Sequence, residues 1–271
     1  QEVWLERASH TGYIGNIYKG VVSRVLPGLQ AAFIDIGLER TAFLHARDMV
    51  RHDPVTTSDG APPEPLISSL LRSGDQLAVQ VIKDPLGSKG ARLTTNISIP
   101  SRFLVLLPDS DVVGISARIE DEFERARLKQ LVRTLRDSTR HQGYIVRTNA
   151  EGVNDFALSA DMVYLGKIWQ AIRERSGTAG PATCIFEDLS LPFRALRDLM
   201  HEDVDRVRID SPEVLRQARD FAERFVPDWL DRIEEYSAER PIFDLFGVED
   251  EIESALRPSV PLKSGGYLVF D

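Results

Sequence analysis

Two phenylalanines occupy equivalent places in neighbouring segments whose residues alternate between apolar and other types. In residues 31–36 the alternation puts the isoleucines on one face and Phe33 on the other, and in residues 41–45 it puts Phe43 opposite the leucine. Aromatic side chains on the outer face of a small sheet are suited to stack on nucleobases, because every base has a π-face. The alternative is a second, minor core in which another domain covers both rings.

A glycine-containing loop carries the densest positive charge of the first hundred residues. Lys83, Lys89 and Arg92 lie close together in sequence around Gly87 and Gly90. Flexible cations supply most of the backbone contacts that proteins make to nucleic acids, so this loop favours phosphate contacts near the two rings. The alternative is a solvated hairpin turn.

The elements that position these residues are short strands. Five alternating segments punctuated by glycine and proline predict a small β-barrel. They span residues 14–25, 31–36, 41–45, 76–83 and 92–99. Between the third and fourth segments, residues 52–74 form a polar, proline-rich insertion that cannot lie in the centre of a sheet, so we expect a surface loop there.

After residue 116 the apolar period changes from that of a strand to that of a helix. Ile119, Phe123, Leu128 and Val132 fall on helical spacing with charged residues between them. The same reasoning predicts a serine-capped helix that begins at Ser211. Further helices are expected at 156–175, 192–203 and 247–256, and further strands at 143–148, 204–210 and 262–270. The predicted fold class is therefore α+β.

Composition excludes several classes of protein. The 271 residues hold 33 Lys and Arg against 42 Asp and Glu, and the net charge of −9 argues against a uniformly basic nucleic-acid-binding coat. The acidic excess lies after residue 100, because residues 1–100 contain ten of each sign. No apolar run reaches the ~18 residues of a membrane span. The chain opens on Gln1 without a leader, and we expect a fragment of a cytoplasmic protein.

Candidate metal ligands and nucleophiles are sparse. The single cysteine, Cys184, excludes an internal disulfide and is expected to be a buried apolar thiol. The five histidines are scattered without ligand spacing. The acidic groups at 120–122 and 249–251 occur where helices are predicted to begin, so we interpret them as partners of helix dipoles rather than as metal ligands. Asp205 and Asp210 are likewise not assigned to a metal site.

Six motifs in a fixed order, spread over essentially the whole chain, resemble the ribonuclease E/G family. They are YIGNIYKG at 13–20, LQAAFIDIG at 29–37, KGARLTT at 89–95, IVRT at 145–148, PIFDLF at 241–246 and LKSGGY at 262–267. The proline-rich insertion favours the ribonuclease G branch of that family over ribonuclease E.

The resemblance implies an RNase H-like domain interrupted by an S1-type OB-fold barrel and a 5′-sensor domain. The implied boundaries are 1–11 and 192–258 for the RNase H-like domain, 12–95 for the barrel, 96–191 for the sensor and 259–271 for the start of a DNase I-like domain. It also implies a homo-oligomeric, Mg²⁺-dependent endoribonuclease of single-stranded RNA that prefers a 5′-monophosphate, processes ribosomal RNA and degrades messages.

The resemblance also assigns roles to individual residues. Family positions that contact RNA match Phe33, Phe43 and Lys89, the three residues already selected from their pattern. Positions that bind the 5′-phosphate match Arg147 and Thr148, although an Arg-Thr pair by itself is an ordinary strand end. Further matches are Ser101 and Val105, which would pack around the terminal nucleotide. Arg118 is not such a match, but its place in the chain puts it near the sensor, where it would either assist electrostatically or lie solvated at a helix start.

Position 101 departs from the family pattern, because ribonuclease E has glycine there. A serine hydroxyl at position 101 could donate a further hydrogen bond to the phosphate. If the backbone at this position needed a positive φ, however, the serine Cβ would destabilise the fold. The family's Mg²⁺-binding aspartates and its paired zinc-binding cysteines lie beyond the matched stretch, so we expect this chain to bind RNA without cleaving it. Two other hypotheses remain, a non-catalytic S1-type module associated with translation and a structural domain whose phenylalanines are covered.

Overall fold

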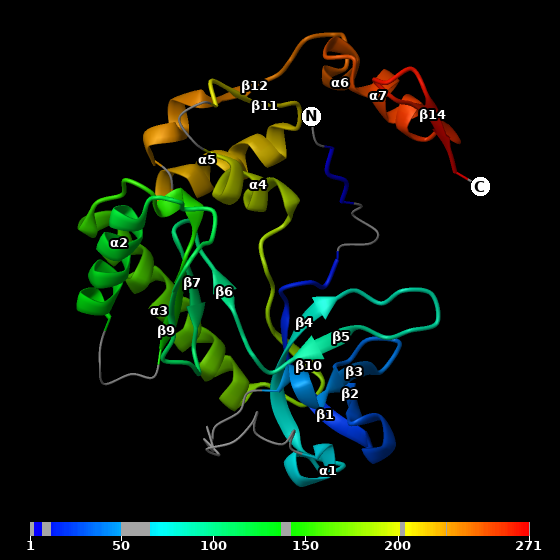
Figure 1. Ribbon diagram of the computed structural model, residues 1–271, viewed down its shortest axis with the longest axis vertical. Coiled ribbons are helices and arrows are strands. Elements are labelled where there is room, and N and C mark those ends of the chain that lie inside the picture. The colour runs from blue at the N-terminus through cyan, green and yellow to red at the C-terminus, as the bar shows by residue number, and fades with distance from the viewer. Residues whose placement is uncertain are drawn as a thin grey trace. The chain divides into compact units, whose positions relative to one another are not determined.

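The computed structural model describes residues 3–6, 12–49, 66–136, 142–200, 204–225 and 227–270. They divide into two compact units, residues 1–194 and 195–271, each of which is described by itself (Figure 1). Both helices and strands occur, which confirms the predicted α+β class. Within the described residues, no helix has the length and apolar character needed to cross a bilayer.

Five strands of the first unit close into a barrel, as the sequence predicts. They are β1 (Ile17–Leu26), β2 (Ala31–Asp35), β3 (Ala42–His45), β4 (Gln76–Lys83) and β5 (Arg92–Thr94). The order is β1-β2-β3-β5-β4, and β4 pairs back onto β1, which closes the ring and is consistent with an OB-like fold. A sixth strand, β10 (Thr183–Phe186), adds to the first residues of β1.

One face of each barrel strand is buried. Ile34, Leu44, Val79 and Leu93 are fully buried in a common core, which is what the alternation of apolar residues predicts. Gly90 lets two segments approach, since a Cβ there would lie 1.9 Å from the carbonyl oxygen of Thr41. Two short 3-10 helices, Pro27–Leu29 and Ala46–Asp48, connect the strands.

Only the last residues of the predicted insertion, 66–74, are described by the structure. Residues 50–65, which carry its prolines, lie outside the described residues. Residues that follow form α1 (Ile67–Leu70), and Ile67 is fully buried in the barrel core. Its backbone amide also donates to the Gln30 side chain at 2.9 Å, so this part of the stretch belongs to the barrel.

A second sheet in the first unit has two helices on one face. Its order is β6-β7-β9-β8, with β6 (Ile99–Pro100), β7 (Leu104–Leu107), β8 (Val113–Ile115) and β9 (Gly143–Val146). The helices are α2 (Glu122–Leu135) and α3 (Asp155–Thr178). Buried residues of β7 and β9 share a core with Leu128, Val132, Leu158 and Leu165 of the helices.

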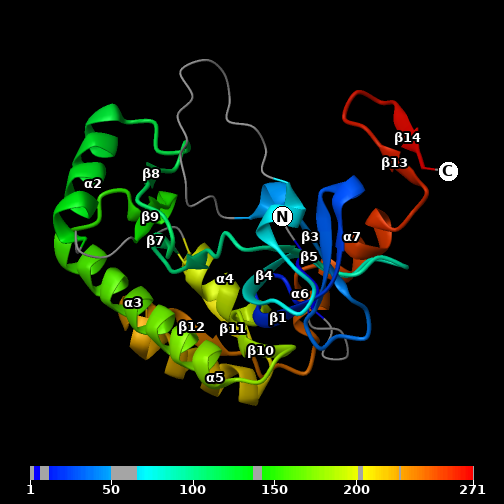
Figure 2. The same cartoon turned by 90° about the horizontal axis from the view of Figure 1, so that it is seen from below.

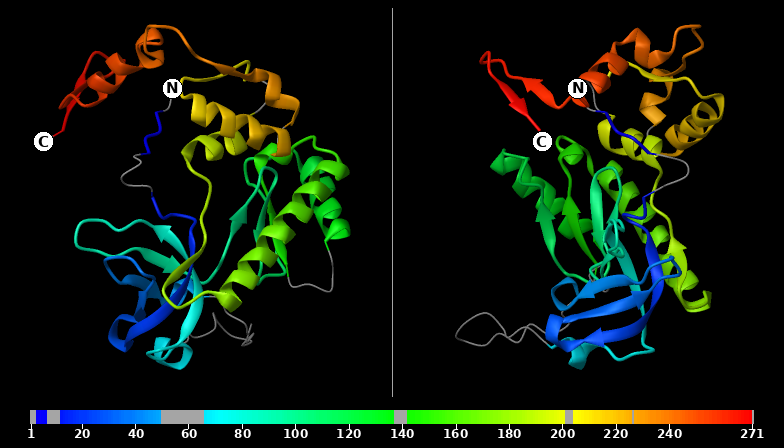
Figure 3. Two further views of the ribbon diagram at one scale, coloured as in Figure 1. Left: turned by 180° about the vertical axis from the view of Figure 1, so that it is seen from behind. Right: turned by 90° about the vertical axis from the view of Figure 1, so that its right-hand side faces the viewer.

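Helix α3 reaches from this sheet to the barrel (Figure 3). Directly after its C-terminus, the carbonyl oxygen of Ala179 accepts a hydrogen bond from Lys19 Nζ of β1 at 2.9 Å. Helix α3 therefore contacts the second sheet through β7 and the barrel sheet through β10 and the Lys19 hydrogen bond.

The prediction that Phe123 lies on the apolar face of α2 is wrong, because its side chain is 88% exposed. The predicted helical period runs on from Ile119, but that residue closes a separate turn in which its amide donates to Ser116. Asp121 then caps the helix by accepting from the Phe123 amide at 2.9 Å. The apolar stripe of α2 therefore begins only at Leu128.

The second unit contains one βαβ arrangement and a hairpin. Strands β11 (Val207–Ile209) and β12 (Ile233–Glu235) are parallel, with α5 (Pro212–Phe225) and a 3-10 helix (Pro227–Arg232) between them. Ser211 caps α5 as predicted, since its hydroxyl accepts from the Val214 amide at 3.4 Å. The remaining elements are α4 (Leu191–Leu199, which spans the division), α6 (Ile242–Leu245), α7 (Val248–Ala255), β13 (Ser259–Pro261) and β14 (Tyr267–Val269).

The domain boundaries implied by the resemblance, and the RNase H-like assignment with them, stay predictions. Of the strand expected over 262–270, only β14 forms; residues 262–266 are the turn of a hairpin in which β14 pairs antiparallel with the preceding β13. Cys184 lies half-buried in β10, where burial raises the pKa of its thiol.

Candidate nucleic-acid interface

The two predicted aromatic residues form a pair on the outer face of the barrel. Phe33 of β2 lies directly opposite Phe43 of β3, with ring centroids 6.2 Å apart and an edge-to-face angle of 69°. His45, two residues further along β3, lies 6.4 Å from the Phe43 ring. Both phenylalanines are half-buried, so each ring stays accessible on the barrel surface.

Cations continue this row on both sides. Arg24 of β1 is the register partner of Phe33, and Arg92 of β5 is the partner of Phe43. Lys83 of β4 is in turn the register partner of Arg92. Side chains that face each other across strands share a sheet face, so the five barrel strands present a row of two aromatics flanked by three cations.

Asp48 fixes the orientation of Arg92. Its carboxylate accepts from Nε and Nη2 of Arg92, and the shortest of these separations is 2.9 Å. Arg92 and Asp48 therefore form a forked pair that holds the guanidinium beside Phe43. The sequence pattern identified Arg92 but missed Arg24 and His45, because only the strand register shows that they lie in the same row.

Lys89 lies in a tight turn that projects from β4 and β5. Leu86 and Lys89 exchange both backbone hydrogen bonds, at 3.0 and 3.1 Å. Gly87 adopts φ +56°, and its carbonyl oxygen accepts from the Arg40 guanidinium. The turn is thus fixed, and the exposed ammonium of Lys89 has no ion-pair partner among the described residues.

The predicted phosphate-binding residues meet at the end of β9. Arg147 follows the strand, and its Nη1 donates to the carbonyl oxygen of Ser101 at 2.6 Å. Its backbone amide donates to Phe103 at 2.8 Å. Thr148 follows at the first position of a 3-10 helix, Thr148–Ala150, and both side chains are half-buried.

A buried carboxylate organises the turn that holds Arg147. Asp161 of α3 accepts from the Ser101 hydroxyl at 2.5 Å, and from the amides of Phe103 and Leu104 at 3.2 and 3.0 Å. Burial raises the pKa of Asp161, whereas these donors and the charge of Arg147 lower it. We refer to Ser101, Arg147, Thr148 and Asp161 as the arginine cluster.

Asp161 was missed by sequence reasoning. The available signal is its position on α3 among Leu158, Met162 and Leu165, all of which are buried. A carboxylate on an apolar helix face must find donors, and so predicts a buried hydrogen-bonding partner.

Ser101 acts through its backbone as well as its side chain. It is 5% exposed, and its φ is not positive, so serine is compatible with this position. Its hydroxyl donates to Asp161, which leaves its carbonyl oxygen as the group that holds Arg147.

Two further predicted residues lie near the cluster. Val105 of β7 is in register with Ile145 of β9, on the sheet face opposite the helices, and Ile145 is 38% exposed. Arg118 is exposed, and its amide donates to the Ser116 hydroxyl at 3.3 Å. The Ser116 amide donates to Val146 at 2.8 Å, which brings this turn beside the strand end that carries Arg147.

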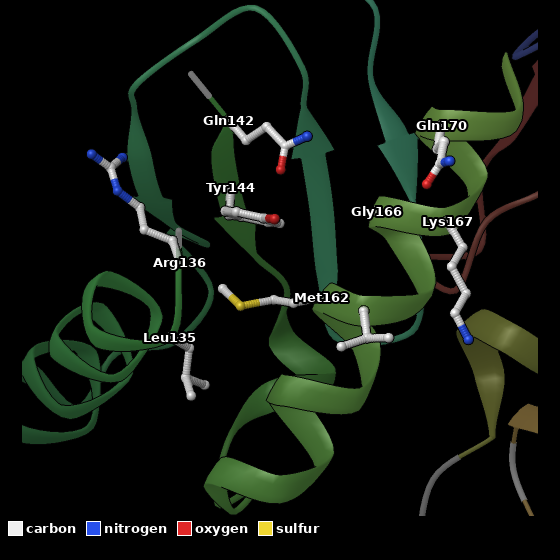
Figure 4. Close-up of a pocket in the computed structure, with 9 residues that line it drawn as sticks. Leu135, Arg136, Gln142, Tyr144, Met162, Gly166, Lys167 and Gln170 are labelled. Atoms are coloured by element: carbon white, nitrogen blue, oxygen red, sulfur yellow. The ribbon is translucent and has the colours of Figure 1, made fainter. Parts of the chain in front are cut away.

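A hollow of about 280 Å³ lies at the opposite end of β9. Its walls include Tyr144 and Met162, while Arg136 and Lys167 at its rim point outward and away from each other (Figure 4). Because its two cations diverge, this hollow does not resemble an anion site.

The described residues do not provide a metal centre. Across those residues, no three histidines, cysteines or carboxylates are grouped so as to hold an ion. Asp121 caps α2, and Glu249, Asp250 and Glu251 occupy the first turn of α7, which confirms that these acids lie at helix N-termini.

Comparison with known proteins decides the family. The model of the ribonuclease E/G family matches residues 98–271. Ribonuclease G of Escherichia coli K12 is 46% identical over 273 residues, which cover 100% of this chain and 55% of that protein. The chain belongs to the ribonuclease E/G family.

Other members of the family give the same result. Ribonuclease G of Haemophilus influenzae is 45% identical over the whole chain, and ribonuclease E of Escherichia coli K12 is 37% identical over 98% of it. The chain resembles ribonuclease G more than ribonuclease E, as its motifs predict. It spans about half the length of the ribonuclease G relatives and about a quarter of ribonuclease E.

Proposed function

We propose that this chain is the RNA-binding and 5′-monophosphate-sensing part of a single-strand-specific endoribonuclease. The observation that carries the proposal is the arginine cluster, in which a buried carboxylate positions a turn and that turn positions Arg147. A side chain held in this way is preorganised, so less conformational entropy is lost when a ligand binds.

The chemistry of the cluster suits a terminal monophosphate. A guanidinium can donate to two phosphate oxygens at once, and the adjacent Thr148 hydroxyl supplies a further donor. A triphosphate is bulkier and would not fit in the same way. The exposed guanidinium of Arg118, beside the same strand end, adds long-range attraction for the anion.

The barrel supplies a path for the rest of the strand. Two bases would stack on Phe33 and Phe43, while Arg24, Arg92 and Lys89 attract phosphates. Recognition of this kind requires unpaired bases, which favours single-stranded over double-stranded RNA.

The activity of the whole protein is part of the same proposal. It would be a cytoplasmic, homo-oligomeric, Mg²⁺-dependent phosphodiester hydrolase that processes ribosomal RNA and degrades messages. The described residues do not fit a Mg²⁺ site, so no catalytic step is assigned to them. That the 271-residue chain binds RNA without cleaving it stays a prediction from the family resemblance.

The test is a comparison of two short single-stranded RNAs that differ only in a 5′-monophosphate or a 5′-hydroxyl. At fixed salt the chain should prefer the monophosphate, and Arg147→Ala should lower that preference about 10- to 150-fold, as expected for charge-assisted hydrogen bonds of about 1.5–3 kcal/mol. Arg173→Ala, an exposed arginine of α3, is the matched control. Equal binding of both RNAs by the wild type would refute the sensor function.

A further inference from the structure

Helix α2, the two residues before it and the one after it carry their charges in two blocks. Residues 120–124 contain four acids, and residues 125–136 contain five basic residues and no acid. In a chain with a net charge of −9, the second block is an unusual concentration of positive charge.

One of the five cations is neutralised. Arg127 Nε lies 2.6 Å from the Glu124 carboxylate, and its other nitrogen donates to Val153. At 3.6 residues per turn, the other four lie within about 80° of each other around the helix axis. We call these four, Arg125, Lys129, Arg133 and Arg136, the basic edge of α2.

The terminal members of the basic edge are held by neutral oxygens. Arg125 donates to the carbonyl oxygens of Ser116 and Ile119 at 2.7 and 3.0 Å, and Arg136 donates to that of Asp111 at 2.9 Å. These hydrogen bonds fix the guanidinium groups without cancelling their charge. The Glu122 carboxylate lies 3.6 Å from Arg125 but is 88% exposed, so it screens that charge weakly.

The central members of the basic edge are open to solvent. Lys129 and Arg133 are both exposed, and neither forms an ion pair or hydrogen bond with another residue in the described part of the chain. The acceptors of Arg125 and Arg136 flank β8, the edge strand of the sheet, so the basic edge follows that strand. Figure 2 shows α2 beside the sheet that contains β8. Two cations without a partner among the described residues therefore lie along an accessible border of the sheet.

The basic edge starts next to the arginine cluster. Arg125 contacts Ser116, whose amide is hydrogen-bonded to Val146, the residue before Arg147. From there the edge extends for about 16 Å along the helix, and residues four apart are separated by about 6 Å of helix rise. This spacing is comparable with the step from one phosphate to the next in an extended strand.

We propose that the basic edge of α2 binds the phosphodiester backbone of single-stranded RNA just downstream of the 5′-monophosphate. The inference rests on the proposed function of the arginine cluster and extends it from the terminal phosphate to the following nucleotides. None of the four residues of the basic edge is aromatic, so we expect binding there to depend on the charge of the phosphates and not on the base sequence. The competing explanation is that the cations only stabilise the C-terminal half of the helix dipole.

The experiment measures the affinity of the chain for a 5′-monophosphorylated dinucleotide and for a 5′-monophosphorylated decamer over a range of salt concentrations. The variant is Lys129→Gln/Arg133→Gln, and the control is Arg173→Gln/Arg175→Gln, which removes the same charge from exposed positions near the end of α3. Circular dichroism checks that each variant is folded.

Each phosphate contact on a single strand contributes about 0.7 to the slope of log K against log salt concentration. Loss of two contacts should lower the slope for the decamer by about 1.4 and its affinity about 25-fold near 0.1 M salt. Dinucleotide binding should be unchanged. The charge reversal Lys129→Glu/Arg133→Glu should weaken decamer binding further.

An unchanged decamer slope, or an equal loss in the control variant, would overturn the proposal and leave the helix-dipole explanation. A decamer with a 5′-hydroxyl distinguishes failure of the basic-edge proposal from failure of the sensor function, because it retains the phosphodiester backbone but lacks the terminal phosphate. If the wild type shows no preference for the monophosphate, the sensor function fails, whereas the slope difference between wild type and variant still tests the basic edge.

Discussion

Replacement of Asp161 by alanine tests whether one buried carboxylate organises the arginine cluster. The substitution removes the acceptor for three donors, the Ser101 hydroxyl and the amides of Phe103 and Leu104. Without it, the turn between β6 and β7 loses three hydrogen bonds and keeps only its backbone bonds, such as that from the Ser101 amide to Leu104, so the Ser101 carbonyl positions Arg147 less firmly.

The magnitude follows from these contacts. A buried donor left without an acceptor costs about 1–3 kcal/mol, so three donors set a range of about 3–9 kcal/mol. The raised pKa of Asp161 shows that burial of the carboxylate already costs free energy, and alanine recovers that part. We therefore expect the lower end, a decrease of about 3 kcal/mol in the free energy of unfolding.

Urea unfolding followed by circular dichroism measures this difference, and RNA binding measures the functional effect. Asp155→Ala, which removes an exposed carboxylate from the first turn of the same helix, should cost less than about 1 kcal/mol. Asp161→Ala should also reduce the preference for a 5′-monophosphate. A loss of stability no greater than that of Asp155→Ala would refute the assignment of Asp161 as the organiser of this turn.

Two further predictions concern the barrel and the effect of pH. Phe33→Ala and Phe43→Ala should each weaken single-stranded RNA binding by about 1–3 kcal/mol, as measured by filter binding. The control Phe123→Ala, at an exposed phenylalanine of α2, should leave the affinity unchanged. If Phe33→Ala and Phe43→Ala bind RNA as tightly as the wild type, the two rings belong to a structural surface that another part covers. Because the folded-state pKa of Asp161 is raised, its titration favours the folded state at acid pH. That contribution should be lost as pH rises from the unfolded-state pKa through the folded-state pKa of Asp161. Over this pH range the free energy of unfolding of the wild type should fall relative to that of Asp161→Asn. A difference between the two proteins that urea unfolding shows to be independent of pH would contradict this prediction.

Local patterns were sufficient to predict the barrel and its aromatic pair. Alternation alone assigns Ile34 and Phe33 to opposite faces, and the structure places the first in the core and the second on the surface. The cap at Ser211 was predictable for the same reason, since a cap depends on residues within one turn.

Features that depend on long-range pairing could not be predicted. β10 is four residues long, and only its register with β1, more than 150 positions earlier, makes it part of the barrel sheet. The role of Asp161 depends on contact with a turn about sixty positions away. The exposure of Phe123 depends on where α2 begins, and element ends are poorly determined by apolar spacing.

The pairing of β10 with β1 has a consequence for the order of folding. All strand partners that close the barrel lie within residues 17–94, so the barrel can close while later residues are still being synthesised. The β1–β10 ladder joins residues so distant that a large loop must be ordered before it forms, and such contacts form slowly. The aromatic surface can thus form in the nascent chain before the residues of the arginine cluster, which lie between 101 and 161, have been synthesised. Under the function proposed above, affinity for unpaired RNA would therefore arise earlier than discrimination of its 5′ end.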